Sequence, residues 1–382
     1  MSEKPQPGPL LPYQRKALEH VQELADRVRS RARYDIRSVL DRAGLTESLY
    51  DDAVESVRSH ARVGLHFHPE RVDRTGRTVA EGLLRTGIYK SQFETGLSSG
   101  SPTAFPGGER DLWESRLFGG AYHEPDASPA GRPKYGALQV MDHPDGPSPR
   151  FGSCYFLLHP GVSARSTFTF GGSHEPYAPE RTGTLAELDP VMAPLLAQLE
   201  QGRGAFGVDN LTVAGCLGQL AYGLSEQYLD PQNRPLGRSL DSFIEAQIHG
   251  GIRLNQDVER LVADPVFRDH PVGESLTTIS RKYEIPLCWH LGFTLAVCKV
   301  PDVFRGYPVR PLAERIAGQG ILDAANIGAM ANSLALEPEG WKGWASHEDT
   351  LTQFRRLWHV LVLNGVPNEA LRRPASSGAA EP

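Results

Sequence analysis

Two segments far apart in the chain alternate apolar and polar residues, and this pattern constrains the fold more than any other feature. In VGLHFHPE the apolar Val63, Leu65 and Phe67 share one face, and the other face carries His66 and His68. In SFIEAQIHGG the apolar positions alternate in the same way with Glu245, Gln247 and His249. Polar groups on a buried strand are costly unless they have partners. The sequence therefore predicts that the two polar faces line a cleft, or that both segments are edge strands with one solvated face.

The rest of the chain predicts an α+β protein with helices at both ends. We expect an N-terminal helical layer at 10–60, a core at 61–260 that contains a loop-rich insertion at 91–150, a C-terminal helical region at 261–366 and a disordered tail at 367–382. The insertion is rich in Gly, Pro and Ser, yet aromatic residues recur along it. Long loops in compact domains are usually functional or disordered, and the aromatic residues favour an ordered loop region.

Individual elements follow from periodicity and from capping residues. Helices are expected in LEHVQELADRVRSRA, in YDIRSVLDRA and after Thr46, and TVAEGLLRTG predicts a short helix that ends at Gly87. FGSCYFLLHP and ARSTFTF predict strands, and 185–230 predicts a helical hairpin. Further helices are expected in DVERLVAD, SLTTISRKYEI and LGFTLAVCKV, and in HEDTLTQFRRLWHVLVLNG up to Gly365.

Composition narrows the class of protein. The 382 residues are 40% hydrophobic and 23% charged, which is enough for a sizeable core. No apolar run is long enough to span a bilayer, and the first residues lack the pattern of a signal peptide, so we expect a cytoplasmic protein with no membrane partner. A net charge of −6 gives no reason to expect bulk nucleic-acid binding. The four cysteines have mostly apolar neighbours and predict buried thiols in a reducing compartment.

Long motifs of the chain resemble a bacterial family of unknown function. These motifs are HFHPERVDRTGRTVAEGLLRTGIYKSQFETG, GGERDLWESRLFGGAYH, RPKYGAL, PRFGSCYF, STFTFGGSH and FIEAQIHGG, and together they cover about residues 60–300. This first resemblance implies no activity.

The order of shorter features is similar to that of ADP-ribosyltransferases with a His, Tyr and Glu core. LHFHP followed by TVAEGLLRTG resembles their first strand, helix and glycine turn, FGSCYF resembles their tyrosine strand, and FIEAQIHG resembles their acidic strand. Glu245 and Gln247 give an ExQ motif where many of these transferases carry QxE or ExE. The resemblance implies two small split sheets around a cleft, with NAD as the substrate and an unknown acceptor.

The same resemblance implies roles for individual residues. Cleavage of the nicotinamide–ribose bond passes through an oxocarbenium-like state that a carboxylate can stabilise, as in glycoside hydrolysis. Glu245 would be this carboxylate, with Gln247 beside it in the catalytic motif. The expected NAD-binding residues are His68 as first choice and His66 as second, Tyr155 as the stacking aromatic with Tyr135 in reserve, and the hydroxyls of Ser166 and Thr167.

Two other classes of function remain open at this point. His66 and His68 form an HxH pair that is familiar from metal sites, and His249, His290 or Glu245 would complete the ligands of a metal-dependent hydrolase. Alternatively, the core is an inactive nucleotide- or partner-binding protein. Trp113, Phe118 and Tyr122 would then form its recognition surface, although simple packing of the insertion also explains them.

Overall fold

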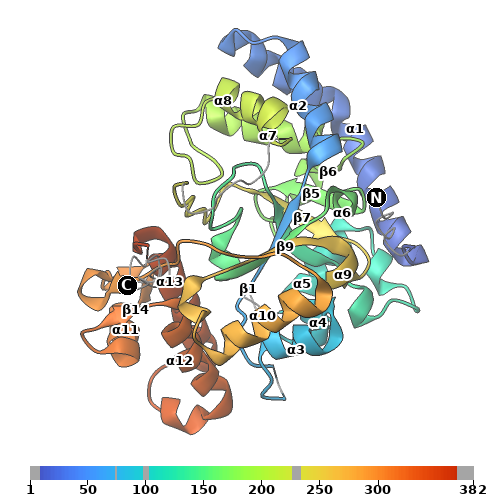
Figure 1. The fold of residues 1–382 in the computed structure, drawn as a ribbon. Coiled ribbons are helices and arrows are strands. Elements are labelled where there is room, and N and C mark those ends of the chain that lie inside the picture. Colours follow the sequence, from blue (N-terminus) through green and yellow to red (C-terminus); the bar gives the residue numbers. More distant parts are fainter. Residues whose placement is uncertain (1–8, 74, 98–102, 226–233, 368–382) are drawn as a thin grey trace, which may run out of the picture.

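A mixed sheet of eight strands forms the centre of the molecule (Figure 1). The computed structural model describes residues 9–73, 75–97, 103–225 and 234–367. In spatial order the strands are β10 (Leu287–Trp289), β9 (Val258–Ala263), β4 (Cys154–Leu158), β1 (Val63–Phe67), β3 (Lys134–Leu138), β7 (Ile244–Ile248), β5 (Ser166–Phe170) and β6 (Thr182–Thr184). The pairs are antiparallel except for β9 and β10, which are parallel.

Three two-stranded sheets and a set of helices surround this sheet. The small sheets pair β2 (Ile88–Tyr89) with β8 (Ile252–Arg253), β11 (Leu295–Ala296) with β14 (Ile321–Leu322), and β12 (Val303–Phe304) with β13 (Tyr307–Pro308). The α-helices up to β9 are α1 (Pro12–Ala43), α2 (Glu47–His60), α3 (Val79–Thr86), α4 (Gln92–Thr95), α5 (Glu109–Leu117), α6 (Pro160–Ser163), α7 (Asp189–Glu200), α8 (Val213–Gly218) and α9 (Leu254–Asp257). After β9 come α10 (Pro271–Tyr283), α11 (Arg310–Ala317), α12 (Ala324–Leu336) and α13 (His347–Asn364).

The N-terminal helices pack beside α7 and α8, at the top of the view in Figure 1. We expected two helices before Thr46, but α1 runs through both segments without a break. Its buried residues continue at helical spacing from Ala25 through Ala32 to Ile36, so no change of face interrupts it. The prediction for α2 is confirmed, because the Thr46 side chain accepts a hydrogen bond from the backbone N–H of Leu49.

The loop-rich insertion contains a central strand of the sheet, which the sequence did not reveal. β3 lies between β1 and β7, and α5 also belongs to this segment. Gly136 allows the close approach of β3 and β1, since a Cβ there would lie 2.6 Å from Val63 Cγ1 and 2.7 Å from the carbonyl oxygen of Gly64. This glycine of the Gly-rich insertion therefore marks tight packing of two strands.

Two of the expected C-terminal helices are wrong. DVERLVAD forms β9, which pairs with β4, and LGFTLAVCKV forms β11 followed by a 3₁₀ turn. Short apolar runs cannot be assigned by periodicity alone, and here pairing with a neighbouring strand decides. The helices in SLTTISRKYEI and HEDTLTQFRRLWHVLVLNG are confirmed as α10 and α13. Parts of the expected hairpin at 185–230 and nearly all of the expected tail lie outside the described residues.

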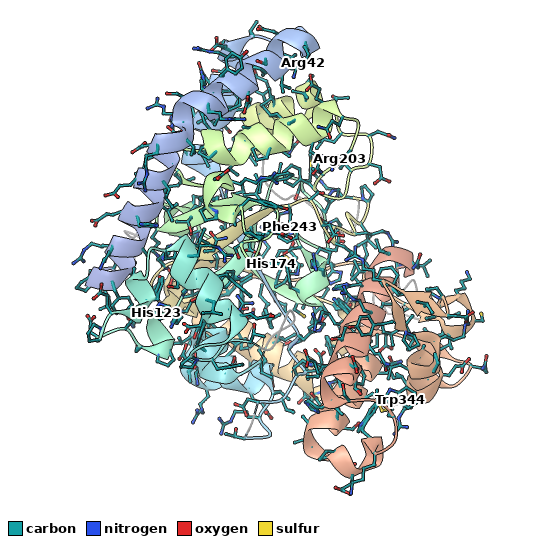
Figure 2. The ribbon with its side chains drawn as sticks, turned by 180° about the vertical axis from the view of Figure 1, so that it is seen from behind. Arg42, His123, His174, Arg203, Phe243 and Trp344 are labelled. Atoms are coloured by element: carbon teal, nitrogen blue, oxygen red, sulfur yellow. The ribbon has the colours of Figure 1, made fainter. Side chains whose placement is uncertain are left out.

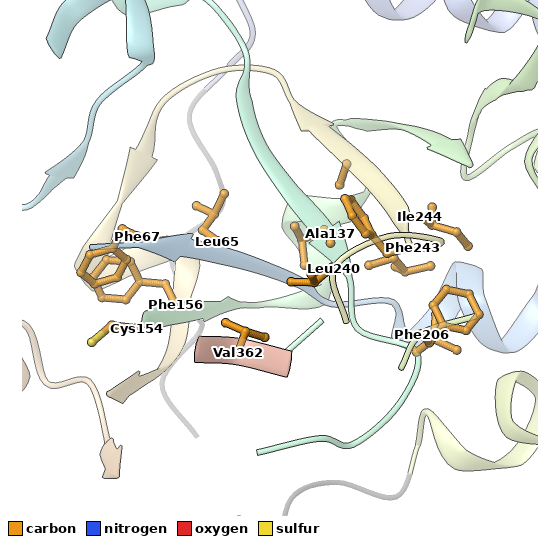
Figure 3. Packing of buried hydrophobic residues seen from close by; sticks show 14 of the residues in the cluster. Leu65, Phe67, Ala137, Cys154, Phe156, Phe206, Leu240, Phe243, Ile244 and Val362 are labelled. Carbon is orange, nitrogen blue, oxygen red and sulfur yellow. The ribbon is translucent and has the colours of Figure 1, made fainter. Parts of the chain in front are cut away.

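The apolar side chains of the strands and the surrounding helices form one large buried cluster. Figure 3 shows Leu65 and Phe67 of β1 beside Phe156 of β4, and Val362 of α13 near the same strands. The C-terminal helix is thus part of the core. The architecture is a central mixed sheet with helical flanks, compatible with the expected α+β class, and the core strands form one sheet where we expected two small ones.

Two further expectations concern the environment of the protein. No helix within the described ranges is long and apolar enough to cross a membrane. All four cysteines are free, but only Cys154 and Cys216 are buried, whereas Cys288 is half-buried and Cys298 is exposed. The prediction of four buried thiols is therefore wrong for Cys298, which follows the short strand β11 in a surface turn.

Candidate functional site

One face of the sheet carries most of the polar residues that the sequence singled out. Residues directly opposite each other on antiparallel strands point to the same face. His66 is paired with Tyr155, and Tyr135 with Gln247. The register continues with Glu245 opposite Thr169 and with Gln247 opposite Thr167. On β1, Gly64 is opposite Ala137 of β3, which is itself opposite Glu245 of β7. The polar faces of β1 and β7 are therefore on the same side of the sheet, with β3 between the two strands.

Ser166 lies on the other face. It is opposite Ile248 in the register, and its hydroxyl donates to the carbonyl oxygen of Val162 at 3.0 Å. This hydroxyl has its partner within its own segment and does not reach the polar face.

His66 is fixed by backbone groups on both sides of its ring. Nδ1 lies 3.1 Å from the carbonyl oxygen of Gly152 and donates to it, and Nε2 accepts from the N–H of Ser148 at 3.3 Å. The ring also stacks on Tyr155 at 4.9 Å. Burial is the main cause that lowers the pKa of His66 to about 3, so the imidazole is neutral. Both ring nitrogens are occupied, which makes His66 a structural link between β1 and the segment before β4.

Glu245 is held by a hydrogen bond from Gln247. The amide Nε2 of Gln247 lies 2.9 Å from Glu245 Oε1 and 3.1 Å from Thr169 Oγ1, and its Oε1 accepts from Thr167 at 2.7 Å. Thr182 donates to the carbonyl oxygen of Ala178, so Thr169 donates to Thr182 and keeps a lone pair for Gln247. The network therefore fixes which way the amide of Gln247 points.

The same chain of hydrogen bonds continues through His249 to Tyr122, in the 3₁₀ turn Ala121–His123 that follows α5. Thr167 uses its proton on Gln247, so it accepts from His249 Nε2 at 3.4 Å. The other ring nitrogen, Nδ1, then accepts from the Tyr122 hydroxyl at 2.5 Å. Burial, followed by the nearby Arg165 and Lys134, lowers the pKa of His249 to about 3, in agreement with a neutral ring. A directed chain thus runs from Tyr122 to the carboxylate of Glu245.

Helix α5 covers part of the polar face and holds Tyr135. The Tyr135 hydroxyl donates to Glu114 Oε1 at 2.8 Å, and Arg132 binds Glu114 Oε2 at 2.9 Å. The guanidinium of Arg110 lies 4.5 Å from the centre of the Tyr135 ring. Burial and the neighbouring Glu114 raise the pKa of Tyr135 well above its usual value. Tyr135 is therefore a neutral hydrogen-bond donor with one ring face beside a cation.

A cleft of about 1150 Å³ runs over this region. Ligand sites typically have volumes of about 300–1,000 Å³, so the cleft accommodates a molecule as large as a dinucleotide. Two of its lining residues, His174 and Phe243, are labelled near the middle of the molecule in Figure 2. Its lining contains more Arg and Lys residues than Asp and Glu residues. The cleft is therefore suited to an anionic ligand.

The cleft separates the sequence-predicted site residues into two groups. It is lined by His66, His68, Tyr135 and Glu245 and not by Gln247, Tyr155, Ser166 or Thr167. His68 is on the cleft wall with its Nδ1 3.3 Å from Glu70 Oε1, and its ring meets the edge of Trp358. The cleft is also lined by Arg150, Arg355 and Arg356, which the sequence did not single out. The adjacent arginines of FRRLWH were a visible signal, but nothing in the sequence placed them beside β1.

The described residues offer few side chains that could coordinate a metal ion together. Within the part of the chain that the structure describes, no group of three or more His, Cys, Asp or Glu side chains is placed to hold a metal. The other histidines considered for such a site have partners: His249 bonds to Tyr122, and His290 lies 2.9 Å from the carbonyl oxygen of Ser153 and accepts from Gly292. The geometry thus gives no support to a site built on the HxH pair.

Comparison with known families matches residues 62–363 to a family described as "Protein of unknown function (DUF3626)". The chain belongs to this family. The match covers the sheet, the cleft and α13 almost completely, so these features are parts of the DUF3626 region. The chain is also similar to the "Gene 2 protein" of Mycobacterium phage L5, with 28% identity over 253 residues, which are 61% of this chain and 82% of the phage protein.

Proposed function

We propose that the cleft binds NAD and that Glu245 promotes cleavage of the nicotinamide–ribose bond, with transfer of ADP-ribose to an acceptor or to water. The observation that carries this proposal is the position of Glu245. Its carboxylate is on a rigid central strand, is oriented by Gln247, and faces a cleft of dinucleotide size whose other walls are rich in cations.

The reaction needs few groups from the protein. The C–N bond between ribose and nicotinamide breaks, and its electron pair leaves with nicotinamide. Positive charge develops at the ribose, and a nearby carboxylate stabilises it. The acceptor then attacks the same carbon and loses a proton. In this proposal Glu245 supplies the carboxylate, and His68, which lines the same cleft, is the candidate to hold a ribose hydroxyl.

The proposal gives the other candidates different roles. Gln247 and Thr167 become positioning residues for Glu245, because both belong to the buried hydrogen-bond chain. His66 and Tyr155 stabilise the segment before β4, and Ser166 takes no part. Tyr135 remains at the cleft, but its ring is available only on the side that Arg110 does not cover.

The test is release of nicotinamide from NAD, measured by chromatography with and without cell extract. We expect the wild-type protein to release nicotinamide and Glu245→Gln, which is nearly isosteric, to lose this activity by at least about 100-fold. The matched control is Glu109→Gln, which changes an exposed carboxylate at the same cleft and should keep the activity.

Two outcomes would contradict the proposal. If Glu245→Gln and Glu109→Gln had the same effect, Glu245 would have no catalytic role. If the wild-type protein bound NAD but released no nicotinamide under either condition, the cleft would be a binding site without turnover.

A further inference from the structure

The C-terminal helix α13 contributes to the wall of the cleft. The indole N–H of Trp358 donates to the carbonyl oxygen of Pro149 at 2.9 Å, and the Trp358 ring meets the edge of His68. Arg355 precedes Trp358 by three residues and therefore lies on the same side of the helix. This docking brings Arg355 and Arg356 to the cleft that Arg150 also lines.

Positive charge is in excess at this place. Arg150 binds Asp241 at 2.8 Å, and Arg305 contacts the same carboxylate. Arg355 and Arg356 have no carboxylate within 4.0 Å among the residues that the structure describes. Arg355 bonds to the Thr352 hydroxyl, and the guanidinium of Arg356 lies 5.9 Å from the centre of the Tyr307 ring. Burial, together with Arg356 and Arg150, lowers the pKa of Arg355.

Several polar atoms in the same cluster lack a partner. Ser148 is one of the residues that line the cleft and is only 1% exposed, yet its Oγ has no hydrogen-bond partner among the described residues. The same holds for Nε of Arg150 and Nε of Arg356, and for both ring nitrogens of the buried His359. His359 is one turn after these arginines on α13. Buried polar groups usually have partners, so the unpartnered Ser148 Oγ, Arg150 Nε and Arg356 Nε are evidence for a bound anion.

We propose that Ser148, Arg150, Arg355 and Arg356 form a subsite for a phosphate group of a nucleotide ligand. The planar guanidinium offers paired N–H donors that match phosphate oxygens, and the Ser148 hydroxyl adds a further donor. The subsite is at the same cleft as Glu245, whose charge acts on Arg150. This inference rests on the proposed function only for the identity of the ligand as NAD, because any nucleotide with a phosphate would use the same groups.

The test compares the binding of ADP, adenosine and inorganic phosphate by calorimetry at low ionic strength. We expect the wild-type protein to bind ADP at least tenfold more tightly than adenosine. The double variant Arg355→Gln/Arg356→Gln should lose at least tenfold in affinity for ADP, with adenosine unchanged. The control Arg31→Gln removes a charge from an arginine on α1 whose side chain is 89% exposed, and should behave as the wild type does. Circular dichroism verifies that the variants fold.

The outcomes separate the two proposals. Loss of ADP affinity in the double variant supports the subsite even when no nicotinamide is released from NAD, in which case only the proposed catalysis fails. Inorganic phosphate that competes with ADP in the wild type but binds the double variant more weakly also supports it. Equal affinities for ADP and adenosine, equal affinities of wild type and double variant for ADP, or no ADP binding to the wild type would overturn it.

Discussion

Replacing Thr167 with Val should break the hydrogen-bond chain that ends at Glu245. The two side chains have nearly the same shape, so the main change is loss of one hydroxyl. This hydroxyl donates to Gln247 Oε1 and accepts from His249 Nε2, and all three residues are fully buried. The substitution leaves a buried acceptor and a buried donor without partners.

The size of the effect follows from these two groups. A buried polar group that loses its partner costs about 1–3 kcal/mol. The 3.4 Å contact with His249 is long and contributes the smaller part, so we expect Thr167→Val to lower the free energy of unfolding by about 2–4 kcal/mol. For a chain of 382 residues, a loss of about 3 kcal/mol corresponds to a decrease of about 4 °C in Tm.

The neighbouring residue on β5 gives a matched control. Ser166→Ala removes a buried hydroxyl from the opposite face, and its acceptor, the Val162 carbonyl, keeps a hydrogen bond from the N–H of Arg165. We expect this control to cost only about 1 kcal/mol. Both variants are measured by urea denaturation with tryptophan fluorescence. If Thr167→Val cost no more than Ser166→Ala, the hydrogen-bond chain as described would be refuted.

Two further predictions concern Gly146, which lies beside His66, and Asp264, which follows β9. Gly146→Ala should destabilise the protein by about 1–3 kcal/mol, because Gly146 has φ +77° and its added Cβ would lie 2.7 Å from His66 Nε2. Thermal denaturation checks this. The control is Gly218→Ala, whose added Cβ would meet no atom within 4 Å outside its own helix, and it should be neutral or stabilising. The difference in free energy of unfolding between Asp264→Asn and the wild type should shift in favour of the variant by up to about 3 kcal/mol as the pH rises from 4 to 7. Burial raises the pKa of Asp264 from 3.8 to about 6, so the carboxylate weakens the folded state as pH rises through this range and the amide does not. Urea titrations at both pH values that give the same difference between variant and wild type would contradict the assignment.

Capping residues and hydrophobic periodicity predicted the helices and strands whose formation depends mainly on nearby residues. Thr46 begins α2, Gly87 in the left-handed conformation ends α3, and the alternating segments form β1 and β7. These features depend on neighbours within a few residues, so a single sequence contains the information. β3 was missed because its role depends on contacts with β1 and β7, which the sequence does not show.

At the candidate site, too, the sequence predicted the features that depend on local pattern and missed those that depend on tertiary contacts. Period-two alternation identified the polar face, and the structure places Glu245 and His68 at one cleft. Alternation did not show that His66 has both ring nitrogens bound to the backbone, or that Gln247 is buried behind Glu245. The arginines of α13 were missed because tertiary packing of Trp358 against Pro149 brings them to the cleft.

The most direct test of the central claim is a crystal structure of Glu245→Gln with NAD. We predict that NAD lies in the cleft, with the ribose that carries nicotinamide within hydrogen-bond distance of residue 245 and a phosphate in contact with Arg355 or Arg356. NAD bound outside the cleft, or in the cleft with this ribose far from residue 245, would contradict the account.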